Sequence, residues 1–183
     1  IPGAKYARIL VGDLQNDRFE DVIALGDKGS HIFKFATNGA VSDVTAMSRL
    51  GGLSARDGVL VDLDFTGKLD LMAVTTSNDV RVFRSPGPSS LYFRDISATS
   101  GVPANLSIAR ELALDDWNND DLIDVAIRRE GSSPQFLAKQ RGGPLVTTNV
   151  ADAWPAGPLV MGDLNNDLRP DVAVVGNGNV EII

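Results

Sequence analysis

The sequence predicts an all-β fold made of repeated units, each with about four short antiparallel strands. Three observations support this prediction. An acidic nine-residue stretch occurs four times, a short apolar run flanks each copy on both sides, and the copies start 49, 54 and 47 residues apart. A regular spacing of about 50 residues indicates a repeat architecture.

The four acidic stretches share one pattern. Asp stands at position 1, an oxygen-bearing side chain at position 3, usually Asp at position 5, and Asp again at position 9. The stretches are residues 13–21, 62–70, 116–124 and 163–171.

The apolar runs on either side of each stretch predict the first two strands of a unit. They are short and rich in β-branched residues, which is typical of buried strands. The acidic stretch is therefore expected to be the loop of a hairpin. The preceding runs are 9–11, 59–61, 112–114 and 159–161, and the following runs are 22–25, 71–74, 125–127 and 172–175.

Two further strands are expected in each unit. Turn residues such as Gly, Asn, Asp and Ser precede a third run in every unit. These runs are 31–35, 80–83, 135–138 and 179–183, and fourth strands are suggested at 41–45, at 93–97 and, in diverged form, near 146–148. No segment has clear helical periodicity, although 47–53 could form one turn.

Units of this size and content match the blades of a β-propeller. The prediction is a single repeat domain over 1–183, with blades at about 4–54, 55–107, 108–156 and 157–183, the last of them incomplete. Because the fourth unit ends after its third strand, further blades are expected elsewhere in the propeller. Open edge strands at the two ends are expected to favour self-association.

The spacing of oxygen atoms in the loops predicts calcium binding. Calcium takes 6–8 oxygen ligands at about 2.3–2.6 Å. Side chains at positions 1, 3 and 5, the carbonyl at position 7 and a carboxylate at position 9 can converge on one ion. Up to four ions are expected, with these ligands: Asp13, Gln15, Asp17, Phe19 and Asp21; Asp62, Asp64, Thr66, Lys68 and Asp70; Asp116, Asn118, Asp120, Leu122 and Asp124; Asp163, Asn165, Asp167, Arg169 and Asp171.

The alternative is that these residues only form turns, as Asp and Asn often do. A turn does not require an acid at position 9, on the edge of the next strand. Three carboxylates within nine residues also repel one another unless a cation joins them. An EF-hand is excluded because position 12 is apolar in all four copies, and a nine-residue glycine-rich calcium repeat is absent.

The loops and their flanking runs, at 13–25, 62–74, 116–127 and 163–175, resemble the FG-GAP/VCBS repeats of the integrin α-chain propeller and of many bacterial surface proteins. The resemblance implies a calcium-binding loop between the first two strands of each blade and an adhesive role. The family favours Gly at position 6, which here is present only as Gly67. Arg18 and Leu168 disfavour a left-handed backbone there, so Asn at position 4 is expected to supply the left-handed turn instead.

Composition limits the remaining functions. The chain has no Cys and a single His, so disulfides, thiolate sites and His-rich zinc sites are excluded, and a net charge of −7 argues against nucleic acid binding. No apolar run is long enough to span a membrane. No acid, base and nucleophile form a recognisable set, so no enzymatic activity is expected.

The expected function is a calcium-stabilised extracellular, cell-surface or periplasmic module that binds a protein or glycan. Two alternatives stay open: a purely structural segment of a larger secreted protein, or part of a propeller-based polysaccharide-processing enzyme. Trp117 in the third loop and Trp154 are candidate ligand contacts, with packing against a neighbouring blade as the alternative.

Overall fold

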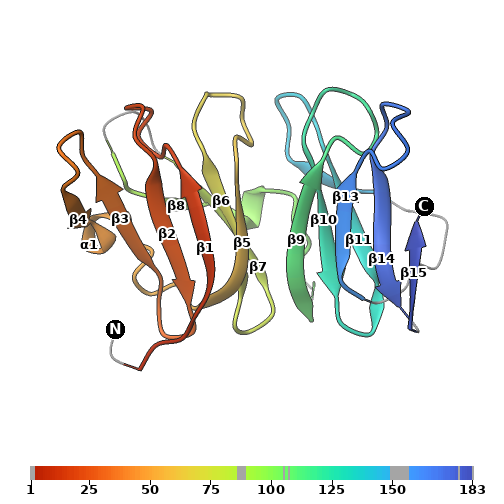
Figure 1. Cartoon of the computed structure of the whole chain (residues 1–183), viewed down its shortest axis with the longest axis horizontal. Coiled ribbons are helices and arrows are strands. Elements are labelled where there is room, and N and C mark those ends of the chain that lie inside the picture. The colour runs from red at the N-terminus through yellow and green to blue at the C-terminus, as the bar shows by residue number, and fades with distance from the viewer. Residues whose placement is uncertain are drawn as a thin grey trace. The chain divides into compact units, whose positions relative to one another are not determined.

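A computed structural model of the chain describes residues 3–85, 90–104, 106, 108–148, 157–176 and 178–182. Its strands form antiparallel sheets in which sequence neighbours are also spatial neighbours (Figure 1). The first sheet contains β1 (Tyr6–Gly12), β2 (Asp21–Gly26), β3 (His31–Phe35) and β4 (Val41–Asp43), and the second contains β5 (Ala55–Val61), β6 (Asp70–Thr75), β7 (Val80–Arg84) and β8 (Arg94–Asp95).

The third and fourth sheets repeat this order. The third contains β9 (Ala109–Asp115), β10 (Asp124–Arg129), β11 (Ser132–Lys139) and β12 (Leu145–Thr148), and the fourth contains β13 (Leu159–Gly162), β14 (Asp171–Gly176) and β15 (Asn179–Ile182). Helix is limited, in the described residues, to α1 (Thr45–Ser48) and the 3-10 turn η1 (Ser97–Thr99). The predicted all-β class is therefore confirmed, and α1 begins two residues before the predicted turn.

The register of the first hairpin is the same in all four sheets. The residue before loop position 1 pairs with the Asp at position 9, as Gly12 with Asp21 and Gly162 with Asp171. The same pairing joins Val61 to Asp70 in the second sheet. Because every hairpin closes at the same point, the acidic stretch of each repeat becomes the same loop.

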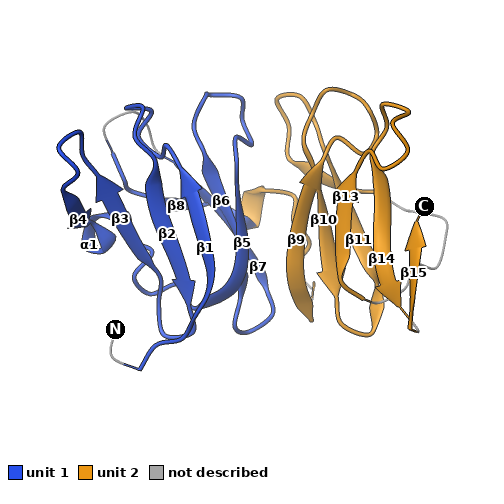
Figure 2. Ribbon diagram, viewed as in Figure 1, with its two compact units in different colours: residues 1–97 blue, residues 98–183 orange. Residues whose placement is uncertain are grey.

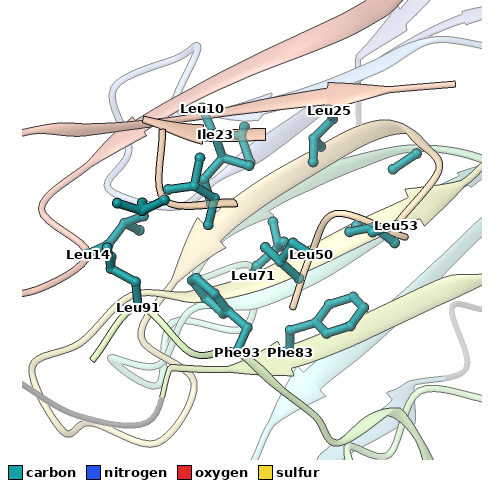
Figure 3. Packing of buried hydrophobic residues seen from close by; sticks show 14 residues of the cluster. Leu10, Leu14, Ile23, Leu25, Leu50, Leu53, Leu71, Phe83, Leu91 and Phe93 are labelled. Atoms are coloured by element: carbon teal, nitrogen blue, oxygen red, sulfur yellow. The ribbon is translucent and has the colours of Figure 1, made fainter. Parts of the chain in front are cut away.

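The chain divides into two compact units, residues 1–97 and 98–183, and each holds two of the sheets (Figure 2). The core of the first unit lies between its two sheets (Figure 3). Figure 3 shows Leu10, Ile23 and Leu25 pointing towards Leu50 and Leu71. Ile23, Leu25, Leu50 and Leu71 have no exposed surface.

The core of the second unit is built in the same way from the third and fourth sheets. Ala126 and Phe136 pack with Leu159, Val172 and Val174. The alternation of buried and less buried residues along β14 follows from the two faces of a strand, since successive side chains point to opposite sides.

Candidate cation-binding loops

Each acidic stretch lies in the loop between the first and second strands of its sheet, as predicted. The carboxylate at position 1 organises every loop, because its two oxygens accept the backbone N–H groups of positions 5 and 6. The donor-to-acceptor distances are 2.9 and 2.7 Å at Asp13, 3.1 and 2.7 Å at Asp62, 2.9 and 2.7 Å at Asp116, and 3.1 and 2.9 Å at Asp163.

Positions 4 and 6 are left-handed in all four loops, with φ between 58° and 77°. The expectation that Asn at position 4 replaces a left-handed position 6 is wrong, since Arg18 (φ 73°) and Leu168 (φ 67°) adopt this conformation as well. The physical reason is the position 1 carboxylate, whose hydrogen bonds from the consecutive N–H groups of positions 5 and 6 hold the backbone in place. The side chain that disfavours the conformation points outward, and Leu168 is 80% exposed.

In the first three loops, the carboxylate at position 9 ties the loop to the end of the third strand of the sheet. One oxygen of Asp124 accepts the N–H of Lys139 at 2.7 Å, and Asp70 accepts the N–H of Ser85 at 2.8 Å. Asp21 makes the corresponding bond to Phe35 at 3.4 Å. These three Asp side chains are almost fully buried, with at most 1% exposure.

Two of these buried carboxylates have an oxygen that makes no hydrogen bond of normal geometry. They are Asp21 and Asp124, in each case at Oδ2. Burial raises the pKa of both, and the backbone N–H groups of Leu14 and Asn118 respectively are near enough to offset part of that rise. Gln15, at position 3 of the first loop, has a buried Oε1 in the same condition. A buried, unpartnered carboxylate oxygen is costly in a folded protein. A cation bound at this point would satisfy it.

Charge in the loops raises the cost of ionising position 9. The pKa of Asp124 is raised to about 6, first by burial and then by the nearby carboxylates of Asp120 and Asp116. The pKa of Asp70 is likewise raised to about 6, first by burial and then by the nearby carboxylate of Asp64. The position 9 charge is therefore within electrostatic reach of the carboxylates at earlier positions of its own loop.

In two of the repeats, a basic side chain from the third strand pairs with a carboxylate of the loop. Lys34 Nζ lies 2.7 Å from Asp17 Oδ2, and this hydrogen bond lowers the pKa of Asp17. Arg84 Nε lies 3.1 Å from Asp64 Oδ2. The corresponding residue of the third sheet is Ala138, which has no charge to offer.

The positions of these two basic side chains could have been predicted from the sequence, but not from the loop residues alone. The backbone N–H that bonds to the position 9 Asp belongs to the next residue after Lys34 in the first sheet and after Arg84 in the second. In the third sheet it belongs to the residue after Ala138. Aligning the third strands on that residue would have placed both basic side chains beside their loops. Among the first three loops, it would also have singled out the third as the one without such a neighbour.

The predicted ligands do not converge fully on one point. Among the described residues, no group of three or more His, Asp or Glu side chains is close enough to hold a metal ion. In the second and fourth loops the side chains at positions 3 and 5 instead bond to each other: Thr66 Oγ1 donates to Asp64 Oδ1 at 2.7 Å, and Asn165 Nδ2 donates to Asp167 Oδ2 at 3.1 Å. The four loops therefore share one backbone framework, but the arrangement of their side chains differs from loop to loop.

The single His and Trp117 pack against neighbouring side chains of their own unit. His31 lies 3.2 Å from Asp43 and stacks against Phe33. Trp117 packs against the core of the second unit, with its ring 5.3 Å from that of Phe136. Trp154 lies outside the described residues.

No model of a known protein family matches the chain, and neither does any curated protein. A solved structure of a lectin from Agrocybe aegerita, described as specifically recognising non-reducing terminal N-acetylglucosamine, is similar to it. The TM-score is 0.65 and the identity 16%, over 96% of this chain and 52% of the lectin chain. The chain thus spans about half the length of that protein, and at this identity the similarity shows a shared all-β fold.

Proposed function

We propose that the chain is a calcium-stabilised β-propeller module of the FG-GAP/VCBS kind that acts outside the cytoplasm by binding a glycan. The observation that supports it most is the fourfold loop framework, in which a position 1 carboxylate holds the backbone. The sheets fit propeller blades, since each is a small antiparallel meander. The similar lectin favours a glycan over a protein as the partner.

Calcium would join carboxylates that otherwise repel. In the third loop the residues that would hold it are Asp116, Asn118, Asp120 and Asp124, with the carbonyl of Leu122. The unpartnered Oδ2 of Asp124 supports this assignment. The ion would neutralise the buried charge, and the loop residues would keep the first two strands of the blade in register.

Function outside the cytoplasm follows from the expected affinity. Extracellular calcium modules have dissociation constants of about 10⁻⁴ to 10⁻³ M, and such sites stay empty at cytosolic calcium levels. No helix in the described part of the chain is long and apolar enough to cross a membrane. Cell fractionation of the native protein tests the location, and recovery in the cytosol would contradict it.

A cavity of about 340 Å³ in the first unit is a candidate glycan site. Its lining combines guanidinium groups, hydroxyls and an aromatic ring, contributed by Arg49, Ser77, Arg81 and Phe83. Such mixed polar and aromatic linings suit saccharides, which present hydroxyls and apolar ring faces. Gly52 also lines the cavity, and a Cβ added there would meet no atom within 4 Å.

A glycan array probed with the chain tests the proposed binding. We expect binding in calcium, with terminal N-acetylglucosamine as the first ligand to examine, and loss of binding in EGTA. Gly52→Trp should reduce binding at least about tenfold by filling the cavity, and Gly52→Ala should not, because a methyl group leaves most of the space open. Calcium-dependent folding without binding to any glycan would instead favour the purely structural alternative.

Hydrolysis or elimination of polysaccharide is the second alternative. We propose that the chain has no such activity, because most acids in the described residues lie in the loops or in ion pairs and none forms an acid–base pair around a cleft. Release of reducing ends from any arrayed polysaccharide by the purified chain would contradict this proposal.

The second loop is expected to bind calcium most weakly. Thr66 replaces the carboxylate at position 5, its hydroxyl already donates to Asp64, and Arg84 pairs with the same Asp64 carboxylate. Thr66→Asp should therefore strengthen calcium binding at this loop about tenfold by calorimetry. Thr99→Asp, outside the loops, is the control and should leave affinity unchanged; equal affinity in Thr66→Asp and wild type would refute the argument.

A further inference from the structure

In each of the two units, the core forms between equivalent faces of its two sheets. In the first unit the first sheet contributes loop position 2 and alternate positions of its strands: Leu10, Leu14, Ile23 and Ile32. The second sheet contributes the intervening set, Leu60, Leu71 and Ala73. We call the first kind of face the trailing face and the second kind the leading face.

The contact between these faces is close. A Cβ added to Gly58 of β5 would lie 2.7 Å from Leu25 Cδ1 and 3.5 Å from Leu10 Cδ1. The leading face of the second sheet is thus in direct contact with the trailing face of the first. Such close packing requires complementary shapes on the two faces.

The second unit repeats this arrangement at equivalent positions. The third sheet presents its trailing face through Ala113, Trp117, Ala126 and Phe136, and the fourth sheet presents its leading face through Leu159, Met161, Val172 and Val174. Trp117 occupies loop position 2, as Leu14 does in the first unit. The same interface therefore occurs twice within the chain, with different side chains.

Each unit leaves one leading face and one trailing face outside its own core. Of these four faces, the leading face of the first sheet and the trailing face of the fourth sheet are the exposed ones. The leading face of the first sheet consists of Ile9, Val11, Val22 and Ala24, at the positions of Leu159, Met161, Val172 and Val174. Ile9 is 66% exposed and Val11 59% exposed. Leu159, which corresponds to Ile9, is only 8% exposed because it packs in the core of its unit.

The trailing face of the fourth sheet is open in the same way. It consists of Val160, Leu164, Ala173 and Ile182, at the positions of Ala113, Trp117, Ala126 and Phe136. Val160 and Ile182 are each 62% exposed, and Leu164 is 56% exposed. Phe136, which corresponds to Ile182, is 1% exposed.

We propose that two copies of this chain associate head to tail, with the trailing face of the fourth sheet of one copy packed on the leading face of the first sheet of the other. Each open face is one half of an interface that the chain already makes internally. The two halves are both apolar, so their contact removes exposed Ile, Val and Leu side chains from water. The similar lectin chain, of which this chain spans 52%, is long enough to supply the equivalent of a second copy in one polypeptide.

Sedimentation of the full 183-residue chain over a range from about 1 to 200 µM tests the proposal. We expect the mass to rise with concentration to at least a dimer. Val11→Glu on the leading face and Val160→Glu on the trailing face should each weaken association at least about tenfold, because a carboxylate would be buried in an apolar contact. Val146→Glu is the matched control, since this Val is 47% exposed on β12 of the third sheet, which contributes neither of the two open faces.

Mixing the two face variants gives the decisive result. Each variant retains one intact face of opposite kind, so an equimolar mixture should form a one-to-one dimer although neither variant associates alone. Ile9→Glu and Ile182→Asp repeat the test if either first variant has a lowered melting temperature. A wild-type monomer at all concentrations, face variants that associate like wild type, a mixture that stays monomeric, or loss of association in Val146→Glu would each overturn the proposal.

Discussion

Calcium is expected to raise the midpoint of thermal unfolding by about 10–20 °C when present at tenfold excess over its dissociation constants. Each occupied loop then contributes about 1.4 kcal/mol, and four loops about 5–6 kcal/mol. For a chain of this size, 1 kcal/mol corresponds to roughly 2–4 °C. The physical reason is that the ion binds carboxylates held together only in the folded state.

Differential scanning calorimetry in calcium, in EGTA and in magnesium measures this effect. Magnesium is the control, since it requires a smaller octahedral shell and dehydrates reluctantly, so it should raise the midpoint far less. Equal midpoints in calcium and EGTA would show that the loops are ordinary turns.

Asp124→Asn is expected to change stability in opposite directions with and without calcium. In EGTA the substitution should stabilise the fold by about 1–2 kcal/mol, because it removes a buried charge that lies near two other carboxylates. The amide oxygen can still accept the N–H of Lys139, as Oδ1 does in the wild type. In saturating calcium the same substitution should destabilise by about 1–2 kcal/mol, since the site loses its closing ligand.

Chemical denaturation of the variant in both conditions measures the two effects. Asp27→Asn is the matched control, because Asp27 also accepts one backbone N–H, that of Lys5 at 2.9 Å, but is exposed and lies outside the loops. Its stability should change by no more than about 0.5 kcal/mol in either condition. Destabilisation of Asp124→Asn in EGTA would mean that the carboxylate is satisfied without an ion.

The strands and the position of the loops were predictable because they depend on local pattern. The apolar runs beside each acidic stretch became the first two strands of a sheet, with the loop closing at the same register in every repeat. Weak fourth strands were also found, such as β8 (Arg94–Asp95), which has only two residues. Binary pattern and turn residues suffice here, since hairpins form between neighbours in the chain.

The left-handed Arg18 and Leu168 could not be predicted from their own preferences. Their conformation is imposed by the position 1 carboxylate five residues earlier, whose hydrogen bonds outweigh a local cost of about 1–2 kcal/mol. The side chains that surround each loop could also not be predicted from the local sequence pattern. Lys34 lies 17 residues from Asp17 in sequence and reaches it only because β3 pairs beside β2.

By itself the sequence determined the all-β class, the fourfold repeat and the loops in which acids gather, because these follow from periodicity and from residues near one another in the chain. Only the tertiary structure decided which position 9 oxygens are buried without a partner and which loops have a basic side chain beside them. It also decided which sheet faces are covered. Burial and long-range charge depend on how sheets pack, and packing joins residues that no local pattern connects.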